Sequence, residues 1–472
     1  MPPATPATLS LLWLEPVIPF ASSLMLLAAG RRLGKRGAAW LGSGAIAASF
    51  VIAVLVSLAY LGAAPAGGGW TEVLWQWIAA GSFTVPVALY LDPLAVVMTL
   101  VVTFVSFLIH VYSAEFMAES EGYARFFGYM NLFVASMLTL VLANNLLLLL
   151  LGWEGVGLCS YLLIGFWYAD EANGLAGRKA FIVTRVGDTA MILGLLLLFN
   201  QFGTLDIQTL MQRASTQWHV GAAVAEVAAF LLLGGAVGKS AQLPLQTWLP
   251  DAMAGPTPTS ALIHAATMVT AGVYLIARVH PLFELAPRAL AAVAVIGLAT
   301  LLLAGFSALA QHDIKRILAY STISQIGYMF LALGVGAWSA AIFHLVTHAF
   351  FKALLFLGAG AVIQGMHEEH DIFKMGGLRK TMPLTFWCFL IAGASLAGLP
   401  LITAGFYSKG LIIWSAWSSA RGATALWVGA LLGALLTALY IFRLIFVVFY
   451  GTGQHEPARR PGAAMAWPMV IL

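Results

Sequence analysis

The sequence predicts an all-α polytopic membrane protein with about 13–14 transmembrane helices. Its 472 residues are 61% hydrophobic and only 9% charged, whereas soluble domains carry about 25% charged residues. Apolar runs long enough to cross the hydrocarbon core of a bilayer recur along the chain. Lys and Arg gather in every second loop between those runs, as they do in proteins oriented in a membrane. Lipid is therefore the expected solvent of this chain.

The predicted spans follow one another closely, and each is an apolar run of roughly 20 residues. In chain order they cover residues 10–30, 37–62, 88–112, 126–142, 145–168, 178–200, 224–250, 259–279, 289–310, 317–336, 338–364, 383–414 and 424–450. A fourteenth run begins near residue 463 and the sequence stops within it, so we expect the natural chain to continue. The N-terminus lacks the basic region of a signal peptide, so the first run is expected to be retained.

The distribution of basic residues predicts the orientation. Loops on the side of the first loop hold 14 of them: Arg31, Arg32, Lys35, Arg36, Arg125, Arg178, Lys179, Lys315, Arg316, Lys374, Arg379, Lys380, Arg459 and Arg460. The loops on the opposite side hold four: Arg213, Arg278, Arg288 and Arg421. Because basic loops stay in the cytoplasm, we expect the N-terminus to lie outside.

Charged side chains also occur at membrane depth. Lys239, Lys352 and Lys409 each lie well inside a predicted span, and Glu154 lies inside the span 145–168. A charge at this depth is costly, so it usually faces protein or water and indicates function. The alternative, in which a long side chain reaches the membrane surface, applies near helix ends. We therefore interpret these four residues as functional.

Arg185 and Asp188 share another span and lie three positions apart. Residues at this spacing are neighbours on a helix, so we expect a local ion pair between them. A structural and a functional role for this pair are equally compatible with the sequence, and we retain both residues as supporting candidates.

Histidines join the buried charges. His264 lies in a span of its own, and His344, His348 and Lys352 follow one another at intervals of four residues. That interval lines one face of a helix with three titratable groups. Zinc is the alternative for the two histidines, but no Glu follows the first one and a cation comes next on the stripe. We expect no metal site.

Lys, His and Glu together predict a proton relay through the middle of the membrane. A Glu–Lys pair that forms and breaks changes the proton affinity of both groups, and histidine titrates near neutral pH. The sequence has no phosphate loop, dinucleotide fingerprint or nucleophile elbow, and no basic run interleaved with aromatics for nucleic acid. The chain therefore offers no redox site or cofactor site of its own.

Two predicted spans are interrupted. The segment 234–258 contains Lys239 followed by four prolines, and the segment 395–410 contains two glycines and a proline ahead of Lys409. Broken helices in a membrane line cavities or other protein. A pair of them at corresponding positions indicates an inverted repeat. The separation of about 160 residues fits two halves of five helices each.

Several segments resemble a known family. GWEGVGLCSYLLIGFW, GKSAQLPLQTWLPDAMAGPTPTSALIHAATMVTAGVYLI, HDIKRILAYSTISQIGYM, THAFFKALLFLGAGAVI and DIFKMGGLRKTMP are similar to segments of the L-type antiporter-like subunits of respiratory complex I, whose mitochondrial counterpart is NADH dehydrogenase subunit 5. The similarity extends from about residue 85 to residue 450. It implies three N-terminal helices in 1–122, a first five-helix half in 123–285, an inverted second half in 286–452, and the start of a further helix in 453–472.

The resemblance also implies a role for each buried group. Glu154 corresponds to the family's pairing glutamate, and Lys239 to the pumping lysine that it modulates. His264 corresponds to the connecting histidine. The central stripe corresponds to His344, His348 and Lys352, and the terminal lysine to Lys409. The family often has an acidic residue after the terminal lysine, whereas this chain has Gly410.

The implied function is proton translocation in the membrane arm of a bacterial NADH:quinone oxidoreductase, driven by quinone reduction elsewhere in the complex. FMN, iron–sulfur clusters and quinone are expected in other subunits. The expected surroundings are the M-type antiporter-like subunit, other membrane-arm subunits and the lipids of the bacterial inner membrane. Alternatives are a subunit of a multi-subunit sodium/proton antiporter, a bicarbonate-uptake or hydrogenase-linked relative, and a structural spacer.

Overall fold

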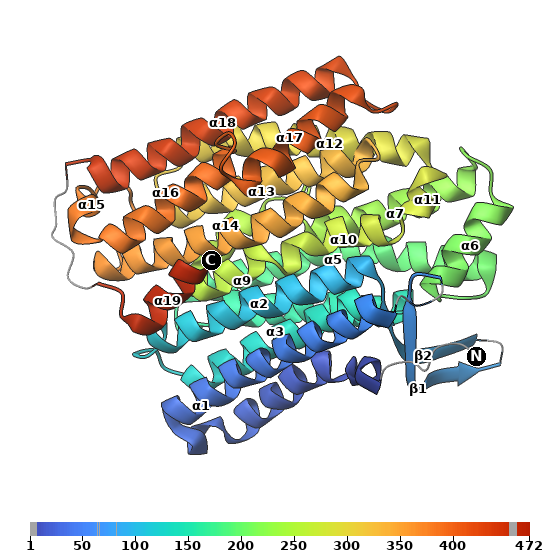
Figure 1. Ribbon diagram of the computed structural model, residues 1–472, viewed down its shortest axis with the longest axis horizontal. Helices are drawn as coiled ribbons and strands as arrows, with labels where there is room; N and C mark the ends of the chain where they lie inside the picture. The colour runs from blue at the N-terminus through green and yellow to red at the C-terminus, as the bar shows by residue number, and fades with distance from the viewer. Residues whose placement is uncertain (1–6, 64, 66, 82, 453–459) are drawn as a thin grey trace.

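Long helices that run side by side make up most of the protein (Figure 1). This computed structural model describes residues 7–63, 65, 67–81, 83–452 and 460–472. Ten helices in this described part are long and apolar enough to cross a membrane. The prediction of a helical polytopic membrane protein is therefore confirmed. The basic α15 (Leu378–Thr381) and α19 (Ala463–Ile471) lie at one end of the helices, and α6 (Ile207–Gln217) lies at the other (Figure 1).

The N-terminal region contains a helical hairpin. A short 3₁₀ helix, Ala7–Leu11, leads into α1 (Leu14–Ala63), which includes both predicted spans 10–30 and 37–62. At Gly34 the backbone is left-handed (φ 66°), a conformation that glycine adopts without strain. The chain reverses there, because Ser49 in the second arm donates to the backbone carbonyl of Glu15 in the first.

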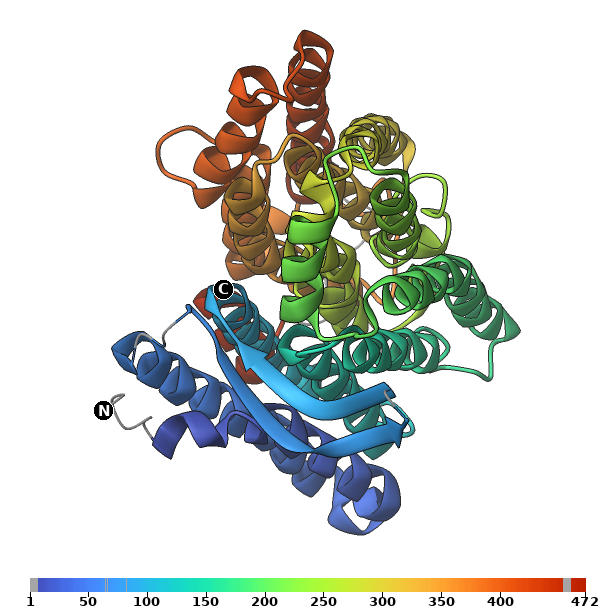
Figure 2. The ribbon, with the colours of Figure 1, turned by 90° about the vertical axis from the view of Figure 1, so that its right-hand side faces the viewer.

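A β-hairpin follows, which the sequence analysis did not predict. Strands β1 (Trp70–Ala80) and β2 (Phe83–Leu91) pair antiparallel, and β2 packs against α2, α3 and α4 across one end of the bundle (Figure 2). The predicted span 88–112 therefore begins later, because α2 covers Pro93–Phe116. Asp92 caps this helix and proline occupies its first turn, both of which fix a helix start.

The range 123–285 contains five membrane-crossing segments, of which the last two are broken. The unbroken ones are α3 (Tyr123–Leu142), α4 (Leu146–Ile164) and α5 (Glu171–Phe202). The expected break is confirmed, since α7 (Ala223–Lys239) ends at the lysine and α8 (Trp248–Asp251) resumes after it. The segment 259–279 was predicted as one helix but consists of α9 (Thr257–Ala265), a 3₁₀ turn and α10 (Ala271–Arg278). No proline or glycine marks this second break.

The range 286–452 also contains five segments, again with the fourth broken. The helices are α12 (Pro287–Ala310), α13 (Ile314–Gly334), α14 (Trp338–Gly365), α16 (Pro383–Ala397), α17 (Ala404–Ser418) and α18 (Thr424–Tyr450). The inverted relation of the two halves stays a prediction. Of the predicted terminal region 453–472, residues 453–459 lie outside the described residues, and α19 covers the fourteenth run.

Burial separates inner from outer helices. The most apolar stretch of the α9–α10 segment is 100% buried, that of α13 is 94% buried and that of α14 is 89% buried. The corresponding values for α5, α12 and α18 are 39%, 50% and 44%. The outer helices thus present a lipid-facing side, whereas the inner ones are surrounded by protein. Polar side chains on the inner helices are therefore shielded from lipid.

Candidate functional site

The buried row of titratable side chains begins with an ion pair. Lys239, the last residue of α7, places its Nζ 3.2 Å from Oδ2 of Asp188 on α5, and each side chain is 1% exposed. Oδ1 of Asp188 accepts a hydrogen bond of 2.6 Å from the indole of Trp153. The lysine and the carboxylate do not meet in hydrogen-bond geometry, so the charges attract without a directed bond. A buried charge depends on such a partner.

Glycines make room for this ion pair. A Cβ on Gly157 of α4 would lie 2.5 Å from Nζ of Lys239. A Cβ on Gly187 of α5 would lie 2.7 Å from the carbonyl oxygen of Gly234 on α7. The lysine therefore occupies a space that only glycine at position 157 leaves open, between helices that glycine allows to approach closely.

A second ion pair lies beside the first. Arg185 Nη1 donates to Glu154 Oε1 at 2.8 Å, and its Nη2 lies 2.7 Å from Oε2. The predicted local pair between Arg185 and Asp188 is therefore wrong. Arg185 and Asp188 share a helix, but each has its partner on a neighbouring helix. Arg185 makes a bidentate contact with Glu154, and Asp188 forms the fully buried pair with Lys239. Glu154 acts on Lys239 through its field and forms no direct ion pair with it.

The two breaks of the first half lie against each other. Ser240, directly after Lys239, donates to the carbonyl of Val269 in the second break at 2.7 Å. Trp248 donates to the carbonyl of Gly238, and Gln242 to that of Ser240, at 3.1 and 3.0 Å. Polar side chains thus satisfy backbone groups that lipid could not satisfy, and they connect Lys239 with the segment that follows His264.

The middle of the row contains two histidines with unengaged rings. His264 and His348 are fully buried, and their ring nitrogens make no hydrogen bond to any residue in the described part of the chain. The ring of His348 approaches the backbone of Ala265 without reaching hydrogen-bond geometry. Lys352 lies close by, with its Nζ donating to the carbonyl of Leu318 at 3.0 Å. Buried polar atoms usually have a partner, often ordered water.

The row ends at Lys409 in the second half. His344 contacts Ser408 Oγ through Nδ1 at 3.0 Å and Gln325 Oε1 through Nε2 at 3.2 Å. Lys409 follows Ser408 on α17, donates to the carbonyl of Leu396 at 2.8 Å and lies 5.2 Å from the centre of the Tyr328 ring. Both ring nitrogens of His344 are thus engaged by polar side chains.

The lysines differ in their partners. Lys239 has a carboxylate, whereas Lys352 and Lys409 donate to backbone carbonyls and make no ion pair with any described residue. Sequence reasoning missed the carboxylate of Asp188 as the partner of Lys239 and missed Gln325 as a polar link. Two features of the sequence could have indicated them: Asp188 is a second acidic residue inside an apolar run, and Gln325 is a polar residue in the middle of the span 317–336.

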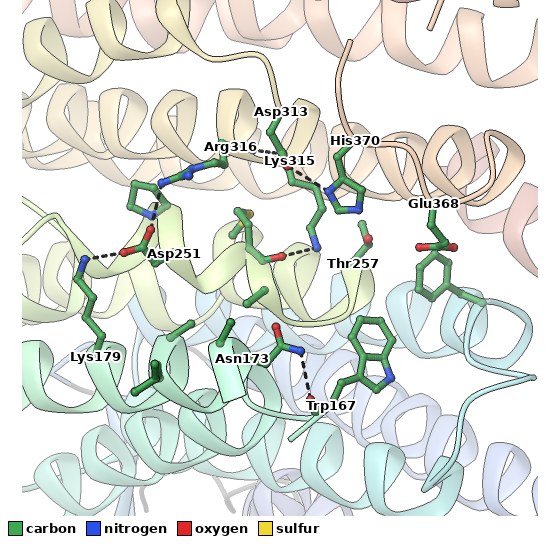
Figure 3. Close-up of a pocket in the computed structure, with 17 residues that line it drawn as sticks. Trp167, Asn173, Lys179, Asp251, Thr257, Asp313, Lys315, Arg316, Glu368 and His370 are labelled. Atoms are coloured by element: carbon green, nitrogen blue, oxygen red, sulfur yellow. Dashed lines mark hydrogen bonds and ion pairs between the residues drawn. The ribbon is translucent and has the colours of Figure 1, made fainter. Parts of the chain in front are cut away.

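A cavity of about 660 Å³ lies between the two halves, at the end of the bundle that the chain reaches after the break at Lys239 (Figure 3). Asp251 follows the break and holds two cations, Lys179 of the first half at 2.5 Å and Arg316 of the second half at 3.0 Å. Lys315 is buried and donates to the carbonyls of Met253 and Gly255 at 2.6 and 2.8 Å. The cavity is therefore lined by charges that tie the break to both halves.

The rim of this cavity contains a carboxylate with an altered pKa. Burial raises the pKa of Asp313, but hydrogen bonds from His370 and from the backbone N–H of Arg316 outweigh burial and lower it below its usual value. The Nδ1 of His370 lies 3.1 Å from Oδ2 of Asp313. Asp313 is thus held as an anion where α13 begins.

Comparisons with known proteins agree on one family. Residues 143–437 match a family model described as "NADH:quinone oxidoreductase/Mrp antiporter, TM". Residues 77–127 match one described as "NADH-Ubiquinone oxidoreductase (complex I), chain 5 N-terminus". Together the two models cover the end of β1, β2, α2, most of both halves and every residue of the buried row.

Curated relatives are similar over almost the whole chain. The chain is 57% identical to NADH-quinone oxidoreductase subunit L of Pseudomonas aeruginosa and 53% identical to that of Escherichia coli. Each alignment covers 98% of this chain and 75% of the relative. Identity to the Mycobacterium tuberculosis subunit is 47%, over 98% of this chain and 73% of the relative.

Solved structures share the fold. A chain of the Mrp complex from a Dietzia species superposes with a TM-score of 0.84 at 31% identity, over 98% of this chain and 49% of that one. A chain of an archaeal membrane-bound sulfane sulfur reductase gives the same TM-score at 25% identity, over 98% and 92%. The architecture thus recurs in membrane complexes with different chemistry.

Proposed function

The chain belongs to the NADH-quinone oxidoreductase subunit L family, the antiporter-like membrane subunits of complex I, and from this premise we propose that its buried row of titratable residues conducts protons. As a member of this family, it works within a proton-translocating NADH:quinone oxidoreductase. One observation carries the assignment of residues: each of Lys239, His264, His348, Lys352, His344 and Lys409 is buried, with members in both halves.

The paired charges of the first half act as the switch. Arg185 and Asp188 lie on one helix, and each holds a partner from another. If Arg185 turned from Glu154 to Asp188, Lys239 would lose its counter-ion and release its proton, because a nearby anion is what favours the charged lysine. The return of Arg185 to Glu154 would favour reloading.

The central groups pass the proton on. The ring of His264 and the ammonium of Lys352 both lie against Phe356. Water bridges to the unengaged rings of His264 and His348 would extend the relay from Lys239 at little cost. Lys352 and Lys409 have no carboxylate partner among the described residues, so a proton that reaches them meets mutual repulsion instead of a counter-charge. That repulsion favours onward transfer to the exit at the second break.

Protons would enter through the cavity that Figure 3 shows. Thr257 lines it and begins α9, which ends near His264, and the charge of Lys315 acts on the same histidine. The basic loops predict that this end faces the cytoplasm. The N-terminus and the β-hairpin would then lie outside a bacterial inner membrane.

The energy for switching comes from outside this chain. We place FMN, the iron–sulfur clusters and the quinone site in other subunits, and we place the M-type antiporter-like subunit beside this one, together with lipid. The likeness to the Mrp complex favours sodium/proton antiport as the second candidate. Sodium needs oxygen ligands, whereas Asp188 is already engaged by Lys239 and Trp153, so the proton assignment is the better supported.

The test is a Lys239→Ala variant of the assembled complex in proteoliposomes, with protons moved per NADH oxidised as the readout. We expect the proton yield to fall while electron transfer to quinone continues, and Lys239→Arg to leave the yield equally low because arginine does not release its proton. Lys374→Ala, which removes an exposed charge paired with Glu369, is the matched control. An unchanged yield in Lys239→Ala would disprove the assignment.

A further inference from the structure

We propose that a hollow beside the turn of the α1 hairpin binds the headgroup of an anionic phospholipid. The hollow measures about 820 Å³ and is formed by the turn of α1 and the start of α3. Its lining includes four basic residues and one acidic residue: Arg31, Arg32, Lys35, Arg125 and Glu121. None of the residues of the buried row lines this site, and the role proposed for it is separate from proton transfer.

The turn of α1 presents Arg31 and Arg32 toward solvent, and Lys35 anchors the turn. Gly34 reverses the chain between Arg32 and Lys35, and the Nζ of Lys35 donates to the carbonyl of Ala118 at 2.6 Å. That bond ties the turn to the segment ahead of α3. Arg31 and Arg32 are exposed and make no ion pair or hydrogen bond with a residue of the described ranges. Their charges are therefore available to a ligand.

Arg125 supplies the opposite wall of the hollow. Its guanidinium lies 4.8 Å from the centre of the Phe166 ring and 4.9 Å from that of Tyr168. Its Nε is buried without a hydrogen-bond partner among the described residues, and Nη2 makes one long contact of 3.4 Å to a backbone carbonyl. A guanidinium held between rings loses little further freedom on binding, and its planar fork matches the oxygens of a phosphate group.

Apolar surface continues from the charged wall. A second hollow of about 230 Å³ shares Arg125, Tyr129 and Tyr168 with the first and extends to Tyr161 and Leu162 of α4. Tyrosines at this level are typical of the interface between headgroups and acyl chains. A ligand that fills both hollows carries an anionic group and an apolar tail. Free phosphate would satisfy only the first.

Helix contact closes the floor of the site. A Cβ on Gly30 of α1 would lie 2.5 Å from the Cβ of Ala124 on α3, so the two helices touch beneath the cations. The headgroup would therefore remain at the surface while a chain follows the groove outward. Basic hollows between helices on the cytoplasmic side attract anionic headgroups, with each basic residue adding a favourable contribution.

The test uses the intact complex in nanodiscs of phosphatidylcholine doped with photoactivatable phosphatidylglycerol. Mass spectrometry of the cross-linked chain measures labelling in 26–35 and 123–129. We expect labelling there with phosphatidylglycerol, and little with an equally photoactivatable phosphatidylcholine. The double variant Arg31→Gln/Arg32→Gln should reduce labelling affinity roughly 25-fold, about fivefold for each charge removed. The double variant Lys374→Gln/Lys380→Gln, with two charges removed elsewhere at the same end, should retain it.

Two further arms separate the alternatives. Arg125→Lys keeps the charge but loses the planar fork, so it should weaken labelling, whereas Arg31→Lys should keep it. Equal labelling by both lipids, an equal loss in the Lys374/Lys380 control, or displacement of the lipid by inorganic phosphate at matched ionic strength would each overturn the proposal. No arm depends on proton pumping, so failure here is distinct from failure of the proposed function.

Discussion

Asp188 is the residue on which the charge of Lys239 depends. Both side chains are buried, and Asp188 is the direct ion-pair partner that Lys239 has in the described part of the chain. Loss of one partner leaves an uncompensated buried charge, which costs about 3–5 kcal/mol, whereas replacing both partners costs far less. Burial disfavours an ammonium, so the charged form of Lys239 depends on this neighbouring carboxylate.

Asp188→Asn should lower the thermal stability of the complex and abolish the proton yield of this chain, because Lys239 would stay neutral without its anion. The double variant Asp188→Asn/Lys239→Gln should regain part of the stability but none of the proton yield. Thermal unfolding and protons moved per NADH measure the two effects. A double variant less stable than the single one would contradict a pairwise ion interaction.

Gly157→Ala tests the space around the same lysine. The added methyl group would lie 2.5 Å from Nζ of Lys239, so the ammonium would have to leave Asp188. We expect a strongly reduced proton yield. Gly410→Ala is the control, since nothing lies within 4 Å of a Cβ there and the helix accepts alanine. It also tests whether the position after Lys409 matters. Equal effects of both substitutions would show that the space at Gly157 is not specific.

At the scale of elements, the broken helices are held by polar side chains and by charges at the cavity. The exposed bridges of Asp251 to Lys179 and Arg316 contribute little stability singly, about 0–1 kcal/mol each. Their value lies in position, because they join the first break to one helix of each half. The start of α13 adds a further link through Asp313 and His370.

The link at Asp313 predicts a pH dependence. Its pKa is lowered in the folded protein, so its stabilising effect is complete above the unfolded pKa of about 4 and is lost as the pH falls through the lowered value. Hydrogen exchange of residues 367–377 should therefore be insensitive to Asp313 titration above about pH 5. Asp313→Asn keeps the helix cap but removes the charge, so it should speed exchange of this loop at neutral pH. Wild-type exchange rates in the variant would exclude the link.

At the scale of the molecule, the inner helices enclose buried titratable residues of both halves. Helix α14 packs against α9 of the first half and against α16 and α17 of the second, so its stripe of His344, His348 and Lys352 bridges the halves. If the proposed proton transfer uses this stripe, both halves belong to one pathway. Independent channels would need separate rows, each open to both sides.

A single pathway predicts that losses do not add. Lys239→Ala and Lys409→Ala should each remove the whole proton yield of this chain, and the double variant should lose no more than either one. The readout is protons moved per NADH in the assembled complex. Partial losses that sum in the double variant would indicate two independent routes. Residues that act as a unit are non-additive, whereas distant independent sites add.

The sequence by itself determined the helical membrane class, the approximate limits of most spans and the identity of the three lysines buried inside them. Hydropathy decides these, because the bilayer imposes a length on each span and a penalty on each charge. Glycine and proline marked the two breaks at Lys239 and Lys409. The β-hairpin escaped notice because its strands are amphipathic and leave the bilayer, and the break after His264 carries no proline.

Only the tertiary structure decided who pairs with whom. Their spacing places Arg185 and Asp188 on one helix face, yet Arg185 pairs with Glu154 and Asp188 pairs with Lys239, both from neighbouring helices. The structure likewise showed that Lys409 lies against Tyr328 without a carboxylate and that Arg125 is held between two rings. Helix packing brings these groups together, and the sequence gives no measure of the distance between helices. Electrostatic pairing depends on that distance, whereas membrane insertion depends on composition.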